Sequence, residues 1–102
     1  MSILFVSPDG DLRVVACRVL RRAGWDVTAV RHSGLALLAC ARGRRFDVVV
    51  VDEREGSGEL TADALARQLR RDCPDIQAVS LRDQRADELI DAVRSAVAAS
   101  PA

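Results

Sequence analysis

The stretch that decides the fold of this chain is Phe46-Asp47-Val48-Val49-Val50-Val51-Asp52. Valine branches at Cβ, so four valines in succession fit poorly in a surface helix and well in a strand. Because the run is continuously apolar, it predicts a strand buried on both faces, as in the middle of a parallel sheet. Asp52 ends the run and is therefore expected at the rim of that sheet.

Three further strands and four helices are predicted around this run, and they alternate along the chain. Short apolar or β-branched runs predict the other strands at Ile3–Val6, Trp25–Val30 and Ile76–Leu81. Apolar residues spaced three and four apart predict the helices at about 11–23, 33–43, 60–71 and 86–99. Asp11 and Ser33 are the expected N-caps of the first two helices. This alternation predicts an α/β domain, in which helices cover both faces of a parallel sheet.

The composition excludes several classes of function. The 102 residues make one domain, and 49% hydrophobic with 29% charged residues is typical of a globular protein. Fifteen acidic residues balance fifteen basic ones, so net charge does not draw the chain to nucleic acid or to a membrane surface. Every basic residue is an arginine, which excludes chemistry that needs a lysine amine. We expect no nucleic-acid or membrane partner.

The cysteines predict a reducing environment. Cys17, Cys40 and Cys73 are too few and too scattered for a disulfide framework, and no CxxC pair suggests a zinc site. We expect each to be a small buried side chain. The chain has neither a basic, apolar leader nor a long apolar run, so we expect a cytoplasmic protein.

The candidate site lies where the predicted strands end. Ligands of open α/β sheets bind beyond the carboxyl ends of the strands, and no glycine-rich phosphate loop follows the first strand here. Asp52 is the foremost candidate, because a carboxylate at the rim can act as a nucleophile toward a phosphoryl donor. The alternative is a loop-initiating aspartate that accepts hydrogen bonds from its own turn.

Several stretches resemble the CheY-like receiver domain of two-component response regulators. They are Ile3–Val6 with the polar turn and helix after it, Ala23–Val27 and Phe46–Asp52. The resemblance covers residues 1–81, and 86–99 resembles the last helix of the family. It implies a three-layer flavodoxin-like fold over 1–99, with 100–102 as a tail or the start of a linker. We expect a shortened, four-stranded parallel sheet in the order 2-1-3-4, with about four helices.

The resemblance also implies site positions. Asp52 matches the phosphoacceptor aspartate, and Ser80 matches the hydroxyl residue that senses the phosphoryl group. Ser7 and Pro8 fall where the family usually carries an acidic pair that binds magnesium, and neither supplies a carboxylate. Asp9 is close but occupies a different position in the turn. We therefore expect no metal site.

A further departure lies between Ser80 and the last helix. Only Leu81–Arg85 intervene, whereas the family inserts a helix, a fifth strand and a Lys-Pro pair there. Such a unit takes about 30 residues and does not fit. A rival alignment makes the last helix the family's fourth; both alignments give four strands. Arg54 or Arg82 could replace the missing lysine in part, because arginine pairs well with phosphate.

Three functions remain open at this point. The first is an atypical receiver domain, without catalytic residues or cofactor, that acts by protein–protein contact and not by magnesium-dependent phosphorylation. The alternative is a receiver that is phosphorylated on Asp52 with Mg²⁺. The second alternative is a small flavodoxin-like domain that binds phosphate or a nucleotide.

The shortened sheet also predicts a partner surface. Without a fifth strand, the fourth strand is an edge, and unpaired edges and uncovered apolar faces favour association. We expect a protein partner or a homodimer through the fourth strand and the last helix. The candidate interface residues are Ile76, Ala78, Leu81 and Leu89.

Overall fold

The computed structural model describes residues 1–53, 60–82 and 86–98. Four strands alternate with four helices, as the sequence predicts. The elements are β1 (Ser2–Val6), α1 (Gly10–Arg22), β2 (Asp26–Val30), α2 (Ser33–Ala41), β3 (Val48–Asp52), α3 (Ala62–Leu69), β4 (Gln77–Leu81) and α4 (Ala86–Ala98). Arg54 and the tail 100–102 lie outside the described residues.

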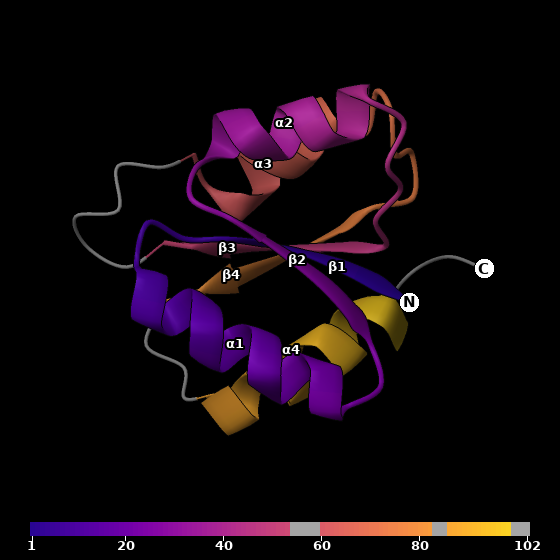
Figure 1. The fold of residues 1–102 in the computed structure, drawn as a ribbon. Coiled ribbons are helices and arrows are strands. Elements are labelled where there is room, and N and C mark those ends of the chain that lie inside the picture. Colours follow the sequence, from indigo (N-terminus) through magenta and orange to yellow (C-terminus); the bar gives the residue numbers. More distant parts are fainter. Residues whose placement is uncertain (54–59, 83–85, 99–102) are drawn as a thin grey trace.

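All strand pairs are parallel, and the sheet has the order β2-β1-β3-β4. The sheet forms the middle of three layers, with α2 and α3 on one face and α1 and α4 on the other (Figure 1). The predicted fold class, strand order and number of helices are thus confirmed. β1 and β3 lie in the centre, and β2 and β4 are the two edges.

The valine run contributes to both apolar cores. Val49 and Val51 face α2 and α3, and Val48 and Val50 face α1 and α4. All four side chains have 0% exposure. Because successive residues of a strand point to opposite faces, a strand with helices on both sides must be apolar throughout. This is why the run contains no alternating polar residue.

Two of the predicted caps were wrong by one or two residues. Asp9, and not Asp11, is the N-cap of α1, and its Oδ1 accepts hydrogen bonds from the backbone N–H of Asp11 and of Leu12. His32, and not Ser33, is the N-cap of α2, where Nδ1 accepts from the Leu35 N–H at 3.3 Å. In each case the helix begins earlier than expected.

The helix ends are closer to prediction. Gly24 and Gly43 follow α1 and α2 with φ angles of +94° and +92°, in the left-handed region that glycine adopts at low cost. α3 is shorter than the predicted 60–71, because Thr61 is its N-cap and accepts from the Ala64 N–H at 3.1 Å.

The position of α4 decides between the two alignments of the last helix. The β3–α3–β4 connection crosses the face that α2 and α3 cover (Figure 1). A right-handed crossover to a further strand outside β4 would use that same face. α4 packs on the opposite face, against α1, β3 and β4. It therefore corresponds to a helix after the last strand of the sheet, and not to the crossover helix of a shortened chain.

Candidate functional site

The carboxyl ends of the central strands bring Ser7 and Asp52 together. Val6 pairs in register with Val51, so the next residue of each strand lies at the same level of the rim. The Ser7 hydroxyl donates a hydrogen bond to Oδ2 of Asp52 at 2.7 Å, across 45 positions of sequence. The same hydroxyl oxygen accepts from the Asp9 N–H at 3.1 Å. Ser7 thus links the end of β3 to the start of α1.

This pair is closed to solvent. Ser7 is 0% exposed and Asp52 is 1% exposed. A buried carboxylate requires hydrogen-bond donors, because water no longer solvates it. The Ser7 hydroxyl is such a donor, at the position where the resemblance implies an acidic residue. The Ser7 hydroxyl therefore gives the buried Asp52 carboxylate a hydrogen-bond donor from the end of β1.

The other residues of the first turn make structural contacts. Pro8 is exposed and carries no polar side-chain atom. The Asp9 carboxylate caps α1 through the two backbone bonds described above. Nη1 of Arg13 donates to the Ser7 carbonyl oxygen at 2.7 Å, which holds this turn against α1.

Glu53 connects the end of β3 to its neighbours. Its N–H donates to the Leu81 carbonyl oxygen at 2.8 Å, and its Oε2 accepts from the Ala62 N–H at the start of α3 at 3.0 Å. Oε1 of Glu53 lies 3.8 Å from Nη2 of Arg82. The Arg82 side chain is 72% exposed, so this ion pair lies at the surface. Ser80 pairs in register with Val51 and is half-buried.

The predicted interface residues are mostly part of the core. Ile76 is 0% exposed and packs with α2 and α3, and Leu81 (4%) and Leu89 (2%) pack on the α1 and α4 side. The expectation that these three side chains form an exposed surface was wrong, because α3 and α4 cover both faces of β4. Ala78 is half-buried.

Two cysteines lie in contact, which was not predicted from the sequence. Cys40 and Cys73 are buried, with their sulfur atoms 3.7 Å apart. Burial, followed by the hydrogen bond with Cys73, raises the pKa of the Cys40 thiol from 9.0 to about 12. A thiol that keeps its proton is a poor nucleophile and metal ligand, so the raised pKa does not favour a reactive role for Cys40. Cys40 lies in α2 and Cys73 follows α3, and both helices cover the same face of the sheet. Placing these two helices side by side would have predicted that the two cysteines are close.

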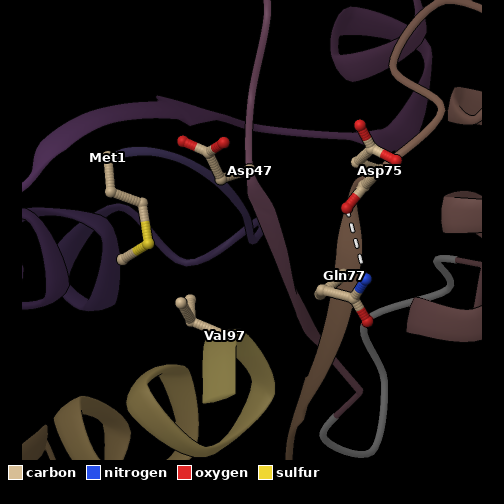
Figure 2. A pocket seen from close by; sticks show the side chains of 5 residues that line it. All are labelled: Met1, Asp47, Asp75, Gln77 and Val97. Atoms are coloured by element: carbon tan, nitrogen blue, oxygen red, sulfur yellow. Dashed lines mark hydrogen bonds between the residues drawn. The ribbon is translucent and has the colours of Figure 1, made fainter. Parts of the chain in front are cut away.

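A separate pocket of about 280 Å³ lies at the opposite end of the sheet. Figure 2 shows its lining, with Asp47 and Asp75 from the connections before β3 and β4, and Val97 from α4. Asp47 accepts a hydrogen bond from the Ser2 N–H at 2.9 Å, and Gln77 donates to the Asp75 carbonyl oxygen. The first bond joins the amino ends of β1 and β3, the second is local to the start of β4, and both lie far from the Ser7–Asp52 pair.

The part of the chain that the structure describes contains no group of three histidine, cysteine or acidic side chains placed to hold a metal ion. In the same part, no helix has the length and apolar character that crossing a membrane requires.

Comparison with solved structures identifies the fold. A response regulator receiver protein from Sinorhizobium medicae superimposes with a TM-score of 0.78 at 22% identity, covering 97% of this chain and 95% of that chain. This chain has the receiver-domain fold. The receiver domain of the hybrid histidine kinase CckA matches with a TM-score of 0.71 at 20% identity, covering 95% of this chain and 99% of that chain. A response regulator from Thermotoga maritima gives 0.61 at 23% identity, over 93% of this chain and 76% of that chain. No protein-family model and no curated protein sequence matches the chain.

Proposed function

We propose that this receiver-fold chain is an atypical receiver domain of two-component signalling, which acts by protein–protein contact and without magnesium-dependent phosphorylation. The observation that carries the proposal is the buried hydrogen bond between Ser7 and Asp52. An aspartate that is 1% exposed offers a phosphoryl donor no direct approach to its oxygens. The domain would then have no catalytic residue of its own.

The described residues near Asp52 are a poor match for a magnesium ion. Mg²⁺ prefers an octahedral set of oxygen ligands, usually with more than one carboxylate. Ser7 and Pro8 stand at the positions of the expected acidic pair, and the Asp9 carboxylate is engaged as the cap of α1. No step of the proposed function therefore passes through a metal ion.

Among the described residues, the cations at this rim that could face a transferred phosphoryl group already have other partners. A phosphoryl group brings up to two negative charges at neutral pH. The chain has no lysine, and among the described residues of this rim Arg82 is paired with Glu53. Arginine remains able to bind phosphate, but here its guanidinium group already faces a carboxylate.

The alternative function is a receiver that uses Asp52 as its phosphoacceptor. The position of Asp52, at the carboxyl end of a central strand, favours this alternative. It requires that the Ser7 hydrogen bond opens and that cations from outside the described residues reach the carboxylate. Both functions use the same residue, so one experiment separates them.

The test is a titration with beryllofluoride and magnesium, followed by the amide NMR signals of residues around Asp52. We expect no saturable shift in the wild-type chain. Saturable shifts that disappear in Asp52→Asn would contradict the proposal and establish the alternative. A restored variant, Ser7→Asp with Pro8→Asp, is the matched control: magnesium should raise its melting temperature and leave that of the wild type unchanged, because only the variant offers an acidic pair.

The remaining parts of the proposal concern partners. A protein partner, or a homodimer through the β4 edge, is the form of contact that we propose, with Ala78 as the half-buried residue of that edge. Light scattering at high concentration tests the homodimer, and a strict monomer would contradict it. Thermal shift with nucleotides, flavin and inorganic phosphate tests the flavodoxin-like alternative, since a bound ligand stabilises the folded state.

A further inference from the structure

A groove of about 680 Å³ lies between α1 and the outer edge of β2. It is distant from the β4 edge, because β2 and β4 are at opposite sides of the sheet. Four arginines of α1 line it, together with Val14 and with Ala29 of β2. The groove therefore joins a positively charged helix face to an open strand edge.

The arginines form a stripe of their own on α1. Val14, Arg18, Arg21 and Arg22 follow the spacing i, i+4, i+7 and i+8, which places them on one side of a helix. The residues that pack into the core, such as Ala16 and Leu20, follow a different stripe. Val14 is 58% exposed between the arginines. The groove thus combines charge with one apolar contact point.

Within the described residues, two of the arginines have hydrogen-bond partners and two do not. Arg13 donates to the Ser7 carbonyl oxygen, and Nη2 of Arg21 donates to the Val27 carbonyl oxygen at 3.0 Å. Arg18 and Arg22 are exposed and make no hydrogen bond or ion pair with any residue in 1–53, 60–82 or 86–98. Their charges are available to an anion.

The edge of β2 offers main-chain groups in the same groove. In a parallel pair, alternate residues direct both N–H and C=O toward the neighbouring strand. Val30 faces β1, since its carbonyl oxygen accepts from the Ser7 N–H, so Val27 and Ala29 face outward. Arg21 occupies the Val27 carbonyl oxygen. Within the described residues, the N–H and C=O of Ala29 remain without a hydrogen bond.

We propose that this groove binds an extended acidic segment of a partner protein. The segment pairs with the N–H and C=O of Ala29 as an added strand, and its carboxylates bind the guanidinium groups of Arg18 and Arg22. Val14 receives an apolar side chain of the segment. Charge complementarity selects the occupant, because Arg18 and Arg22, which have no partner among the described residues, lie beside this strand edge. The proposal goes beyond the function above and holds whether or not Asp52 is phosphorylated.

A single-stranded nucleic acid is the competing occupant. Its recognition depends on aromatic side chains on which bases stack, and no aromatic residue is among those that line the groove. A strand edge with an available N–H and C=O instead favours a polypeptide. The test below includes an oligonucleotide so that the two occupants are distinguished.

The experiment measures fluorescence anisotropy of a labelled peptide of alternating glutamate and valine residues. We expect saturable binding that weakens with added salt, because the contacts are between exposed charges. The affinity of the double variant Arg18→Ala, Arg22→Ala for the peptide should be about tenfold lower, because two charge-assisted hydrogen bonds are lost. Both side chains lack described partners, so circular dichroism should show an unchanged melting temperature.

Matched controls are available in the chain and in the probe. Arg67→Ala, Arg71→Ala removes two exposed arginines from the α2 and α3 side and should leave the affinity unchanged. A peptide of alternating glutamine and valine should bind weakly, and the Ala29 amide signal should shift only with the glutamate peptide. The proposal would be overturned by no binding to the wild type, by equal binding to the Arg18→Ala, Arg22→Ala variant, or by tighter binding of an oligothymidylate of the same length. An Ala29 amide that does not shift in the peptide complex would refute strand addition.

Discussion

The two edge strands of the sheet, β2 and β4, share one contact near their amino ends, an arginine that donates to a backbone carbonyl oxygen. Beyond this contact they differ. At β2, Arg21 donates to the Val27 carbonyl oxygen at 3.0 Å, and at β4 Nε of Arg70 donates to the Ile76 carbonyl oxygen at 3.2 Å. Each arginine precedes its acceptor by six residues and lies at the end of the helix before the edge strand. Each occupies a carbonyl group at the beginning of an open edge.

Beyond this shared contact the edges have different electrostatics. The β2 edge continues beside Arg18 and Arg22, which have no partner in the described part of the chain, whereas the β4 edge continues with the small side chain of Ala78. Like charges repel a second copy of the same edge, and natural sheets use such charges to prevent edge-to-edge pairing. We therefore expect the β2 edge to suit an oppositely charged partner and the β4 edge, at Ala78, to suit an uncharged one.

The largest expected effect comes from the side chains that hold a helix beside each edge. Leu20 of α1 and Leu65 of α3 are both 0% exposed. Replacing either with alanine should lower the free energy of unfolding by about 2–5 kcal/mol, through lost burial and a residual cavity. Urea denaturation of Leu20→Ala and Leu65→Ala measures both. A loss below about 1 kcal/mol in only one variant would show that the two edges are not equally supported.

The next effect concerns the centre between the two edges. Ser7→Ala removes a donor to the buried Asp52 carboxylate and should lower the free energy of unfolding by about 1–3 kcal/mol. Asp52→Asn keeps an acceptor oxygen, so a double-mutant cycle of the two changes measures their coupling. Independent, additive effects would contradict the hydrogen bond.

The α2 and α3 side also has a pH dependence. The pKa of the Cys40 thiol is raised to about 12 in the folded chain, from the ordinary 9.0 that the unfolded chain should have. The folded state therefore retains a proton that the unfolded state releases. The protonated Cys40 thiol therefore contributes fully to the stability of the folded state below pH 9. As the pH rises from 9 toward 12, the free energy of unfolding should fall by at most about 1.4 kcal/mol per pH unit.

Cys40→Ala tests this dependence against Cys17→Ala. Thermal melts between pH 8 and pH 11 should show that the dependence of stability on pH becomes weaker in the Cys40 variant and stays unchanged in the Cys17 variant. Because Cys73 also contacts Cys40, a Cys73→Ala variant should reduce the slope in part. An unchanged slope in Cys40→Ala would contradict the assignment.

The smallest effect on stability, and the sharpest test of the comparison, comes from the two edge arginines. Arg21→Met and Arg70→Met each remove one hydrogen bond to an edge carbonyl group and should cost about 0.5–1.5 kcal/mol. We expect Arg70→Met to increase self-association, because the neutral β4 edge loses its blocking side chain. Arg21→Met should remain monomeric, since Arg18 and Arg22 still repel a second copy. Sedimentation velocity measures the self-association of both variants. Equal self-association would contradict the proposed difference between the β2 and β4 edges.

The sequence predicted the architecture because the four valines allow few alternatives. A strand with no polar side must lie between two layers of helices, and its neighbours follow from the alternation of elements. The cap of α1 was harder, because Asp9 and Asp11 are both good caps and only the local backbone geometry distinguishes them. The candidate site was predicted by position, and the Ser7–Asp52 hydrogen bond was not, because it depends on the register of β1 with β3.

The interface residues show the opposite failure. Ile76, Leu81 and Leu89 are apolar, and an apolar residue near a sheet edge suits an interface and a core equally well. The distinction depends on the placement of α3 and α4 over β4, and it became visible only with the structure. The arginine contacts to the edge carbonyl groups likewise have no signature in composition, since solvated arginines at helix ends are common.

The serine–aspartate contact has a consequence for folding. If β1 and β3 assembled two residues out of alignment, the apolar side chains would still reach their proper faces, and burial alone would penalise the error little. The carboxylate of Asp52 would then be enclosed among hydrocarbons without the hydroxyl donor, at a cost of about 1–3 kcal/mol or more. One polar pair at the rim therefore helps to discriminate the native alignment from misassembled ones that the uniform valine run would otherwise tolerate.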